Sequence, residues 1–280
     1  MAYRNMETTK LILQNLLDKT AALTNVFKRN ILKEYLQVVV LDYLYSHPSY
    51  SKLVFYGGSC LAHCHGLPRR SEDLDFVDLG KSVVLPELAR DIADYLKKNT
   101  DLEVKATVQK YRVYLKFSVL SELGLATPGE SDLLFLKVEV FDRFDYCKNY
   151  KIEMIPLFKE GKSMIIRTFD LATLMATKVQ AVLQRTWEKT DKDGRILMQV
   201  KGRDYFDLLW YLQKGIKPNI TCMGDIKTRE ELKKALLMNV EKVNARSIVL
   251  DLEPLIADKD FVSNLSKNIK DILRAEIAKL

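Results

Sequence analysis

The chain has 280 residues, of which 48% are hydrophobic and 29% are charged, and its formal net charge is +7. This composition fits a globular protein of one large or two modest domains, and it excludes a membrane-spanning chain because no apolar run approaches the roughly 20 residues that cross a bilayer. Four cysteines are too few for a disulfide scaffold and the N-terminus has no signal-peptide segment, so we expect a cytoplasmic protein with reduced thiols.

The first expected elements are amphipathic helices within residues 8–46. Leucines from Leu11 to Leu17 begin one apolar pattern, and a second pattern runs at helical spacing from Ile31 to Tyr45. His47-Pro48 ends this helical region, because the residue before a proline is disfavoured in the helical conformation.

The next stretch predicts a strand, a glycine-rich turn and a short helix. Leu53–Tyr56 is an apolar run, Gly57-Gly58-Ser59 interrupts it, and a helix is expected from Cys60 to His65. The start of a helix presents free backbone N–H groups, and Ser59 adds a hydroxyl, so Gly58 and Ser59 are candidates to bind phosphate. The alternative interpretation is an ordinary strand-to-helix turn in which the serine caps the helix.

A second strand follows and contains two acidic residues. Side chains alternate along a strand, so Asp73 and Asp75 share one face while Leu74 and Phe76 share the other. Neighbouring carboxylates repel each other unless a cation lies between them, and Mg²⁺ bridging to substrate phosphates is a common solution. The alternative is a solvated acidic strand end.

The chain continues with a helix over 86–98, strands over 103–107 and 113–120, a loop over 124–132 and a strand over 134–141. One face of this last strand is aliphatic and is expected in the core. The other face carries Glu139, which can join Asp73 and Asp75 as a third carboxylate if the two strands are neighbours. A surface ion pair is the alternative for Glu139.

The C-terminal part of the chain is expected to be helical. A helix is predicted over 170–185, and Lys178 lies in the middle of its apolar stripe, with Arg185 at the same edge. A lysine aimed at a core is costly unless it is paired or the stripe opens onto a cleft, so Lys178 is a candidate phosphate ligand.

A polar loop over 186–202 precedes a helix over 203–213, in which Asp204 and Asp207 lie one turn apart. These aspartates either hold Lys178 or Arg185, orient a substrate hydroxyl, or serve as first-turn carboxylates favoured by the helix dipole. Two or three more helices are expected over 228–280. The strand signal ends near Arg167, so we predict domains over residues 1–167 and 168–280.

Four potential metal ligands, Cys60, His63, Cys64 and His65, lie within six residues. They cannot all face one zinc ion from a single short helix, because only positions three or four apart share a face, so packing is favoured over a zinc site. Among basic residues, Arg69, Arg70, Lys81 and the 189–203 run are candidates for contacts to RNA phosphates, with a solvated surface as the alternative.

Taken together, these motifs resemble the polymerase β-like nucleotidyltransferase superfamily, and within it the AbiEii/AbiGii toxin group. The resemblance covers about residues 28–260. It is carried by Gly57-Gly58-Ser59, Gly66-Leu67-Pro68-Arg69, Ser71-Glu72-Asp73-Leu74-Asp75-Phe76, Lys178-Val-Gln-Ala-Val-Leu-Gln-Arg185 and Arg203-Asp204-Tyr205-Phe206-Asp207-Leu208.

The resemblance implies an α+β fold: a nucleotidyltransferase domain with a small mixed sheet, followed by a C-terminal helical domain that closes the cleft. It implies Mg²⁺-dependent transfer of a nucleoside monophosphate from an NTP to an RNA acceptor, with the tRNA 3′ end as the expected acceptor. The protein would act as the toxin of a toxin–antitoxin or abortive-infection system, with an antitoxin as partner.

Within this scheme, Asp73, Asp75 and Glu139 hold two Mg²⁺ ions. Gly58 and Ser59 bind the β and γ phosphates, together with Lys178 and Arg185 as further nucleotide ligands. Lys178, Asp204 and Asp207 complete the expected catalytic set. The alternatives are a transferase that modifies a protein or a small molecule, as aminoglycoside-modifying enzymes do, and a non-catalytic member that binds a nucleotide or a partner.

Overall fold

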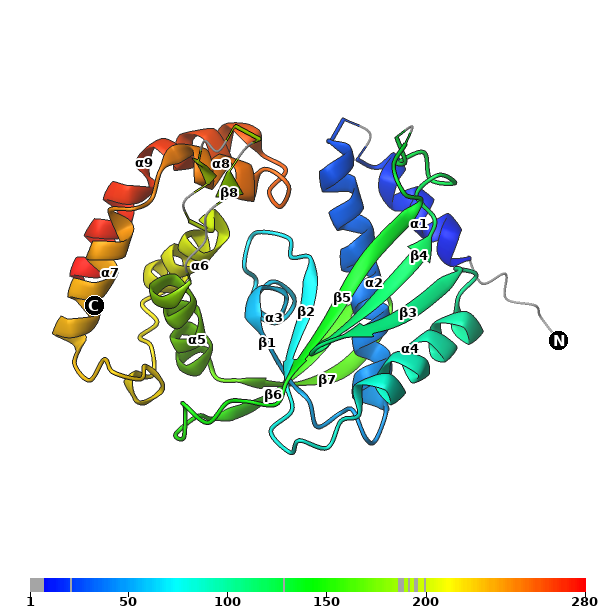
Figure 1. The fold of residues 1–280 in the computed structure, drawn as a ribbon, viewed down its shortest axis with the longest axis horizontal. Coiled ribbons are helices and arrows are strands. Elements are labelled where there is room, and N and C mark those ends of the chain that lie inside the picture. Colours follow the sequence, from blue (N-terminus) through cyan, green and yellow to red (C-terminus); the bar gives the residue numbers. More distant parts are fainter. Residues whose placement is uncertain are drawn as a thin grey trace. The chain divides into compact units, whose positions relative to one another are not determined.

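The computed structural model describes residues 8–20, 22–127, 129–185, 189–190, 192–193, 196–198 and 200–280 (Figure 1). The chain forms two compact units whose segments alternate along the sequence. The first unit consists of Met1–Phe55, Arg70–Arg143 and Met154–Arg167, and the second of Tyr56–Arg69, Phe144–Glu153 and Thr168–Leu280. The division into domains 1–167 and 168–280 stays a prediction. No helix in the described part of the chain is long and apolar enough to cross a membrane.

Seven strands form one mixed sheet, in the order β3-β4-β5-β2-β1-β7-β6. Strands β2 and β5 pair in parallel, whereas β3 and β5 each pair antiparallel to β4. The strands are β1 Val54–Tyr56, β2 Asp73–Val77, β3 Val104–Gln109, β4 Arg112–Ser118, β5 Leu133–Phe141, β6 Ile152–Lys159 and β7 Lys162–Phe169. This confirms the expected mixed α+β architecture.

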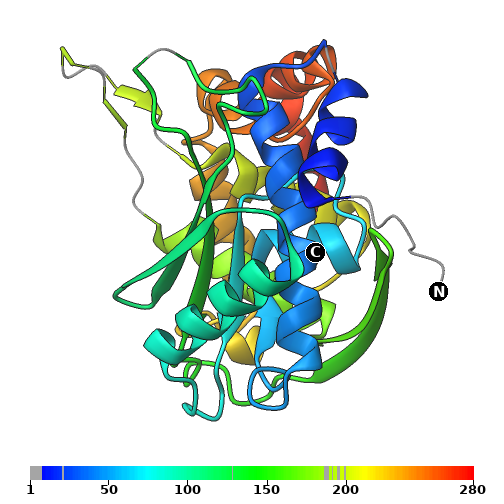
Figure 2. The same cartoon turned by 90° about the vertical axis from the view of Figure 1, so that its right-hand side faces the viewer.

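Three helices accompany the sheet in the first unit: α1 Thr9–Asp18, α2 Asn25–Ser46 and α4 Leu85–Asn99. The hydroxyls of Thr8 and Thr24 cap α1 and α2, and Pro86 in the first turn suits the start of α4. α2 packs against β5, and α4 packs against β3 and β4 (Figure 2). Both helices cover the aliphatic face of the sheet, so the opposite face carries the polar side chains.

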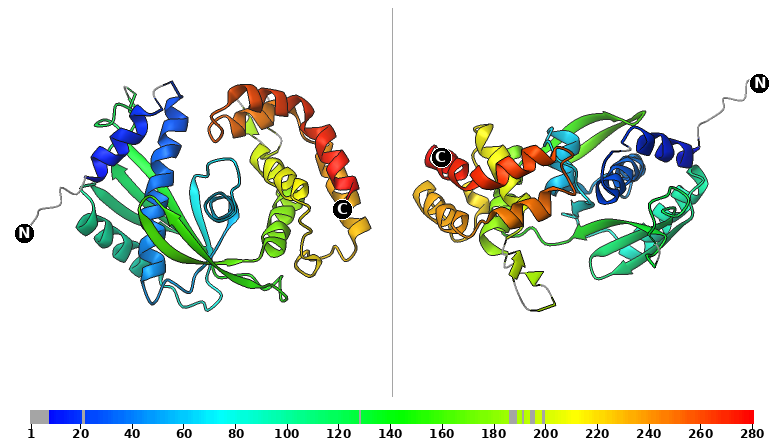
Figure 3. Two further views of the ribbon diagram at one scale, coloured as in Figure 1. Left: turned by 180° about the vertical axis from the view of Figure 1, so that it is seen from behind. Right: turned by 90° about the horizontal axis from the view of Figure 1, so that it is seen from above.

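The second unit is mainly helical (Figure 3). Its helices are α3 Gly57–Cys64, α5 Leu171–Gln184, α6 Gly202–Gln213, α7 Arg229–Val240, α8 Ala245–Leu252 and α9 Lys259–Ala278, with the short 3₁₀ helix η1 Ile220–Cys222 and the small strand pair β8 Lys189–Thr190 and β9 Ile196–Met198. α6 contacts α5, α8 and α9 and is buried along most of its length, so it is the central helix of this unit.

The crossing of α6 and α8 depends on Gly202. A Cβ atom at this position would lie 2.8 Å from the Ile248 Cα and 2.8 Å from the Ser247 carbonyl oxygen. Both are backbone atoms and cannot turn away as a flexible side chain can. The absence of a side chain at Gly202 therefore allows the two helices to approach this closely.

Most expected elements are observed, with a few differences. The predicted helix over 170–185 is α5, and the Asp170 carboxylate caps it by accepting from the Thr173 N–H. The three C-terminal helices are α7, α8 and α9. The hairpin of β6 and β7 was not assigned from the sequence. Much of the predicted 186–202 loop lies outside the described residues.

The expectation of four reduced cysteines is wrong for two of them. Cys147 and Cys222 form a disulfide within the second unit, whereas Cys60 and Cys64 are free thiols. The two bridged residues are 75 positions apart in sequence, which explains why no spacing pattern indicated the pair.

Candidate active site

The first group of candidate residues lies on the polar face of the sheet in the first unit. Asp73 and Asp75 alternate with buried Leu74 and Phe76 along β2, as the strand period requires. β5 lies directly beside β2, and the register pairs Asp75 with Glu139 and Asp73 with Lys137. The strand arrangement on which the role of Glu139 depends is therefore present.

Glu139 is buried and is bound to an arginine from the next strand. β4 pairs with β5 so that Arg112 lies opposite Glu139, and the Arg112 Nε donates to a Glu139 carboxylate oxygen at 2.6 Å. Arg112 also donates to the Tyr111 hydroxyl at 2.7 Å. Burial opposes the charge on Arg112, but the adjacent Glu139 carboxylate outweighs it and raises the pKa of the guanidinium.

Asp73 has a basic neighbour as well. The Lys137 ammonium lies 3.4 Å from an Asp73 carboxylate oxygen, across the β2–β5 pair. The polar face thus carries three acidic and two basic side chains in two neighbouring rows, Arg112–Glu139–Asp75 and Lys137–Asp73.

The donor chemistry on this face fits a hard divalent cation, because three carboxylates project from the same face of paired strands. Within the described residues, no three acidic, histidine or cysteine side chains converge closely enough to form a metal site. Arg112 and Lys137 instead neutralise Glu139 and Asp73.

The second group of candidate residues lies in the second unit and forms a continuous ion-pair network. The Lys178 ammonium on α5 lies 2.8 Å from Asp204 Oδ1 and 2.8 Å from Asp207 Oδ2, both on α6. Arg185 contacts the other Asp204 oxygen at 3.0 Å. Arg69 donates from Nε and Nη2 to the two oxygens of Asp207, each at 2.6 Å.

Burial and charge act against each other in this network. Burial would raise the pKa values of Asp204 and Asp207, but Lys178 beside Asp204 and Arg69 beside Asp207 outweigh it and hold both pKa values below the usual range. Burial likewise opposes the charge of Lys178, and the two carboxylates nevertheless raise its pKa. Asp204, Asp207 and Lys178 are therefore all charged at neutral pH.

Arg69 is the residue of this network that sequence reasoning misassigned. The sequence suggested contacts of Arg69 and Arg70 with RNA phosphates, but the Arg69 side chain is 1% exposed and bound to Asp207. Arg70 pairs with Glu34 in the first unit. No local pattern could have found the first pair, because its members lie 138 residues apart.

The Gly-Gly-Ser segment forms the first turn of α3, so this helix begins three residues earlier than expected. Gly57 has a φ of +79°, a left-handed conformation that glycine adopts without strain. Ser59 is fully buried. The role of Gly58 and Ser59 as phosphate ligands stays a prediction.

The four residues of the cysteine and histidine cluster differ in how far they are buried. Cys60 is buried and its Sγ lies 3.1 Å from the Thr168 hydroxyl, while Cys64 is partly exposed. His63 is buried, and burial lowers the pKa of His65. These contacts agree with packing in the core of the second unit.

Comparisons with known proteins give one family and several similar folds. A family model described as "Nucleotidyl transferase AbiEii toxin, Type IV TA system" matches residues 40–275. The chain resembles the crystal structure of MenT4, a nucleotidyltransferase toxin from Mycobacterium tuberculosis, with 14% identity, a TM-score of 0.54, and coverage of 97% of this chain and 90% of that one. This likeness supports the fold.

Two structures from Helicobacter pylori have a TM-score of 0.46. JHP933 is 19% identical, with 89% of this chain and 94% of that chain covered. A putative nucleotidyltransferase is 17% identical, with 88% and 95% covered. No curated protein sequence matches the chain.

Proposed function

The chain belongs to the AbiEii nucleotidyl transferase toxin family of type IV toxin–antitoxin systems, and on this premise we propose that it transfers a nucleoside monophosphate from an NTP to RNA, at the 3′ end of tRNA. The nucleotidyltransferase activity, the NTP substrate and an antitoxin partner follow from the family. The RNA acceptor and the metal are the proposed parts.

The observation that carries the proposal is the register of β2 against β5. It places Asp75 opposite Glu139, with Asp73 on the same face two residues away. We propose that these carboxylates bind two Mg²⁺ ions, which would lower the pKa of the attacking hydroxyl and neutralise the triphosphate. In the same rows of side chains, Arg112 pairs with Glu139 and Lys137 pairs with Asp73.

Lys178 is proposed to contact the triphosphate. The ammonium group of Lys178 has three N–H donors. Two of them point at Asp204 and Asp207, and these contacts fix the direction of the third N–H. Asp204 and Asp207 then act by positioning Lys178, and Asp204 also holds Arg185. Gly58 and Ser59 are proposed to bind the β and γ phosphates with the N–H groups that open α3.

The test is to incubate the purified protein with each NTP labelled at the α-phosphate, Mg²⁺ and total RNA. We expect label in tRNA, and loss of transfer to background in the Asp75→Asn variant. Asp225→Asn removes a carboxylate from an exposed turn and serves as the matched control.

Label in a protein or in a small molecule, with none in RNA, would replace the RNA acceptor by one of the other acceptors. Full transfer by Asp75→Asn would remove the carboxylates from the mechanism. Binding of NTP without transfer to any acceptor would identify a non-catalytic member.

A further inference from the structure

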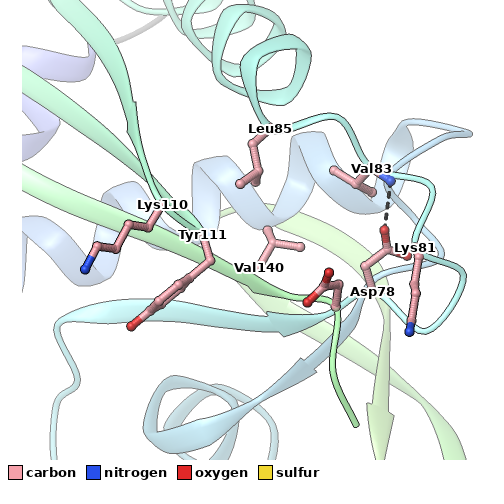
Figure 4. A pocket seen from close by; sticks show the side chains of 8 residues that line it. Asp78, Lys81, Val83, Leu85, Lys110, Tyr111 and Val140 are labelled. Atoms are coloured by element: carbon pink, nitrogen blue, oxygen red, sulfur yellow. Dashed lines mark hydrogen bonds between the residues drawn. The ribbon is translucent and has the colours of Figure 1, made fainter. Parts of the chain in front are cut away.

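The first unit contains a pocket of about 410 Å³ that none of the roles above uses (Figure 4). It is built where β2 and β5 end and includes residues of the turn between β3 and β4. Val140, Val83 and Leu85 give it an apolar wall. A cavity of this size with an apolar wall and a few polar groups is typical of a ligand site.

Tyr111 supplies an aromatic ring to this pocket. The ring lies 4.6 Å from the Phe141 ring, centroid to centroid, and 4.6 Å from the Arg112 guanidinium carbon. The side chain is partly exposed and lines the pocket. Aromatic rings held in this way are common platforms for stacking of unpaired bases.

Two lysines stand at the rim. Lys81 and Lys110 are exposed and line the pocket, and neither forms an ion pair with any described residue. Both adopt left-handed backbone conformations, with φ of +50° and +56°. Glycine or asparagine adopts this conformation at lower cost, so structure alone does not favour lysine at these positions.

The two acidic residues of the pocket have different surroundings. The Asp78 carboxylate accepts from the N–H groups of Gly80 and Val83, at 3.2 and 2.8 Å, and so holds the loop that carries Lys81. Asp142 is exposed at the pocket and can accept from a hydroxyl. The pocket thus offers a stacking surface, two cations and a hydroxyl acceptor, which are the partners of a base, its phosphates and a ribose.

The position of the pocket relates it to the carboxylates of the same unit. Val140 directly follows Glu139 on β5, and Asp78 lies three residues beyond Asp75, about 10 Å along the strand direction. Because side chains alternate along a strand, Val140 points to the face opposite Glu139, so a ligand in the pocket would lie at the end of these strands and not on the carboxylate face.

We propose that this pocket binds an unpaired nucleotide of the RNA acceptor, with its base against Tyr111 and its phosphates at Lys81 and Lys110. The inference rests on the proposed RNA acceptor and names the part of the first unit that receives it. The NTP is not the occupant we propose, because its phosphates are assigned to Gly58 and Ser59.

The test measures binding of a fluorescently labelled eight-nucleotide single-stranded RNA by anisotropy, at several salt concentrations and without NTP. Lys81→Asn and Lys110→Asn remove the charges while asparagine tolerates the left-handed backbone. We expect the double variant to bind more weakly and to lower the slope of log affinity against log salt by about 1.4, from about 0.7 for each lost phosphate contact.

Tyr111 is tested by two substitutions. Tyr111→Leu keeps apolar contact with Phe141 but removes the stacking surface, and we expect a loss of affinity of about 5- to 150-fold. Tyr111→Phe keeps the ring and should bind as the wild type does. Lys52→Asn makes the same charge change as each single lysine substitution, in an exposed turn outside the pocket, and should leave affinity and salt slope unchanged. Circular dichroism confirms that each variant is folded.

Unchanged RNA affinity in the lysine double variant and in Tyr111→Leu would overturn the inference. Nucleoside monophosphates are titrated in parallel: a loss of their binding with intact RNA binding would show that the pocket takes free nucleotides, which also overturns it. If RNA binding depends on the pocket but no label reaches RNA, the inference stands and the proposed function fails. If label reaches RNA and the pocket variants change neither this transfer nor RNA binding, the proposed function stands and the inference fails.

Discussion

Asp207 is fully buried, and both of its oxygens lie within hydrogen-bond distance of cations: Oδ1 contacts Arg69, and Oδ2 contacts Arg69 and Lys178. Buried ion pairs contribute little compared with apolar packing, yet removing one partner is costly because the other charge stays in the interior. A single substitution in this network is therefore expected to lower the stability of the second unit strongly.

We expect Asp207→Ala to lower the free energy of unfolding by about 3–5 kcal/mol, because Arg69 would remain buried without its carboxylate. Arg185→Ala removes the half-exposed member of the same network and should cost less than about 1 kcal/mol. Urea denaturation of the two variants measures both values. If both variants lost the same free energy of unfolding, burial of the partner would not determine the cost of removing it.

The same carboxylates predict how stability depends on pH. The folded-state pKa values of Asp204 and Asp207 are below those of the unfolded chain, about 3.9, so the unfolded state binds more protons on acidification. Their contribution is complete at neutral pH and is lost progressively as the pH falls below about 5.

Lys178 has a raised pKa and gives the opposite sign, since its contribution is lost only at pH values above about 10.4. Unfolding free energies measured between pH 7 and pH 3 should fall for the wild type and fall less steeply for Asp207→Asn. Parallel curves for the two proteins would show that this carboxylate does not control acid stability.

At the scale of helices and strands, local signals predicted the elements that local chemistry determines. α5 begins at its capping residue Asp170, and Asp73 and Asp75 share a face because a strand alternates. The strand β6, which was not predicted, contains Pro156, and proline is tolerated there because β6 is at the edge of the sheet. Sheet order cannot be read from one segment.

The close crossing of α6 and α8 gives a second test at this scale. Gly202→Ala should lower the free energy of unfolding by about 1–3 kcal/mol, because the added methyl group meets backbone atoms of α8. Gly80→Ala is the matched control, since its Cβ would meet only side-chain atoms at 3.6 Å. Thermal unfolding followed by circular dichroism compares them. A stable Gly202→Ala protein would mean that α8 can shift without cost.

For the molecule as a whole, long-range pairing limited what could be predicted of the site. The carboxylates Asp73 and Asp75 follow from one strand, but the neighbour relation of Glu139 depends on how β2 and β5 pair across more than sixty residues. The Arg112 partner of Glu139 depends on a further strand. The partnership of Arg69 and Asp207 required the complete fold.

The chain belongs to a toxin family, so the activity of the whole protein can be tested by its effect on bacterial growth. Expression of the wild-type chain in a bacterial host without an antitoxin should arrest growth, and Asp75→Asn should relieve the arrest. Asp225→Asn should remain as toxic as the wild type. Colony counts after induction, with protein levels checked by immunoblot, measure the effect. Arrest by Asp75→Asn would separate toxicity from the proposed chemistry.

The interleaved order of the segments also affects how the protein is synthesised. Arg69 leaves the ribosome 138 residues before Asp207, an interval of roughly 7 to 30 seconds at bacterial elongation rates. During that time α3 and Arg69 cannot adopt their final environment, because α6 does not yet exist. A nascent chain that stops before Asp207 therefore lacks a completed second unit. The folded toxin can form only after translation has passed that residue.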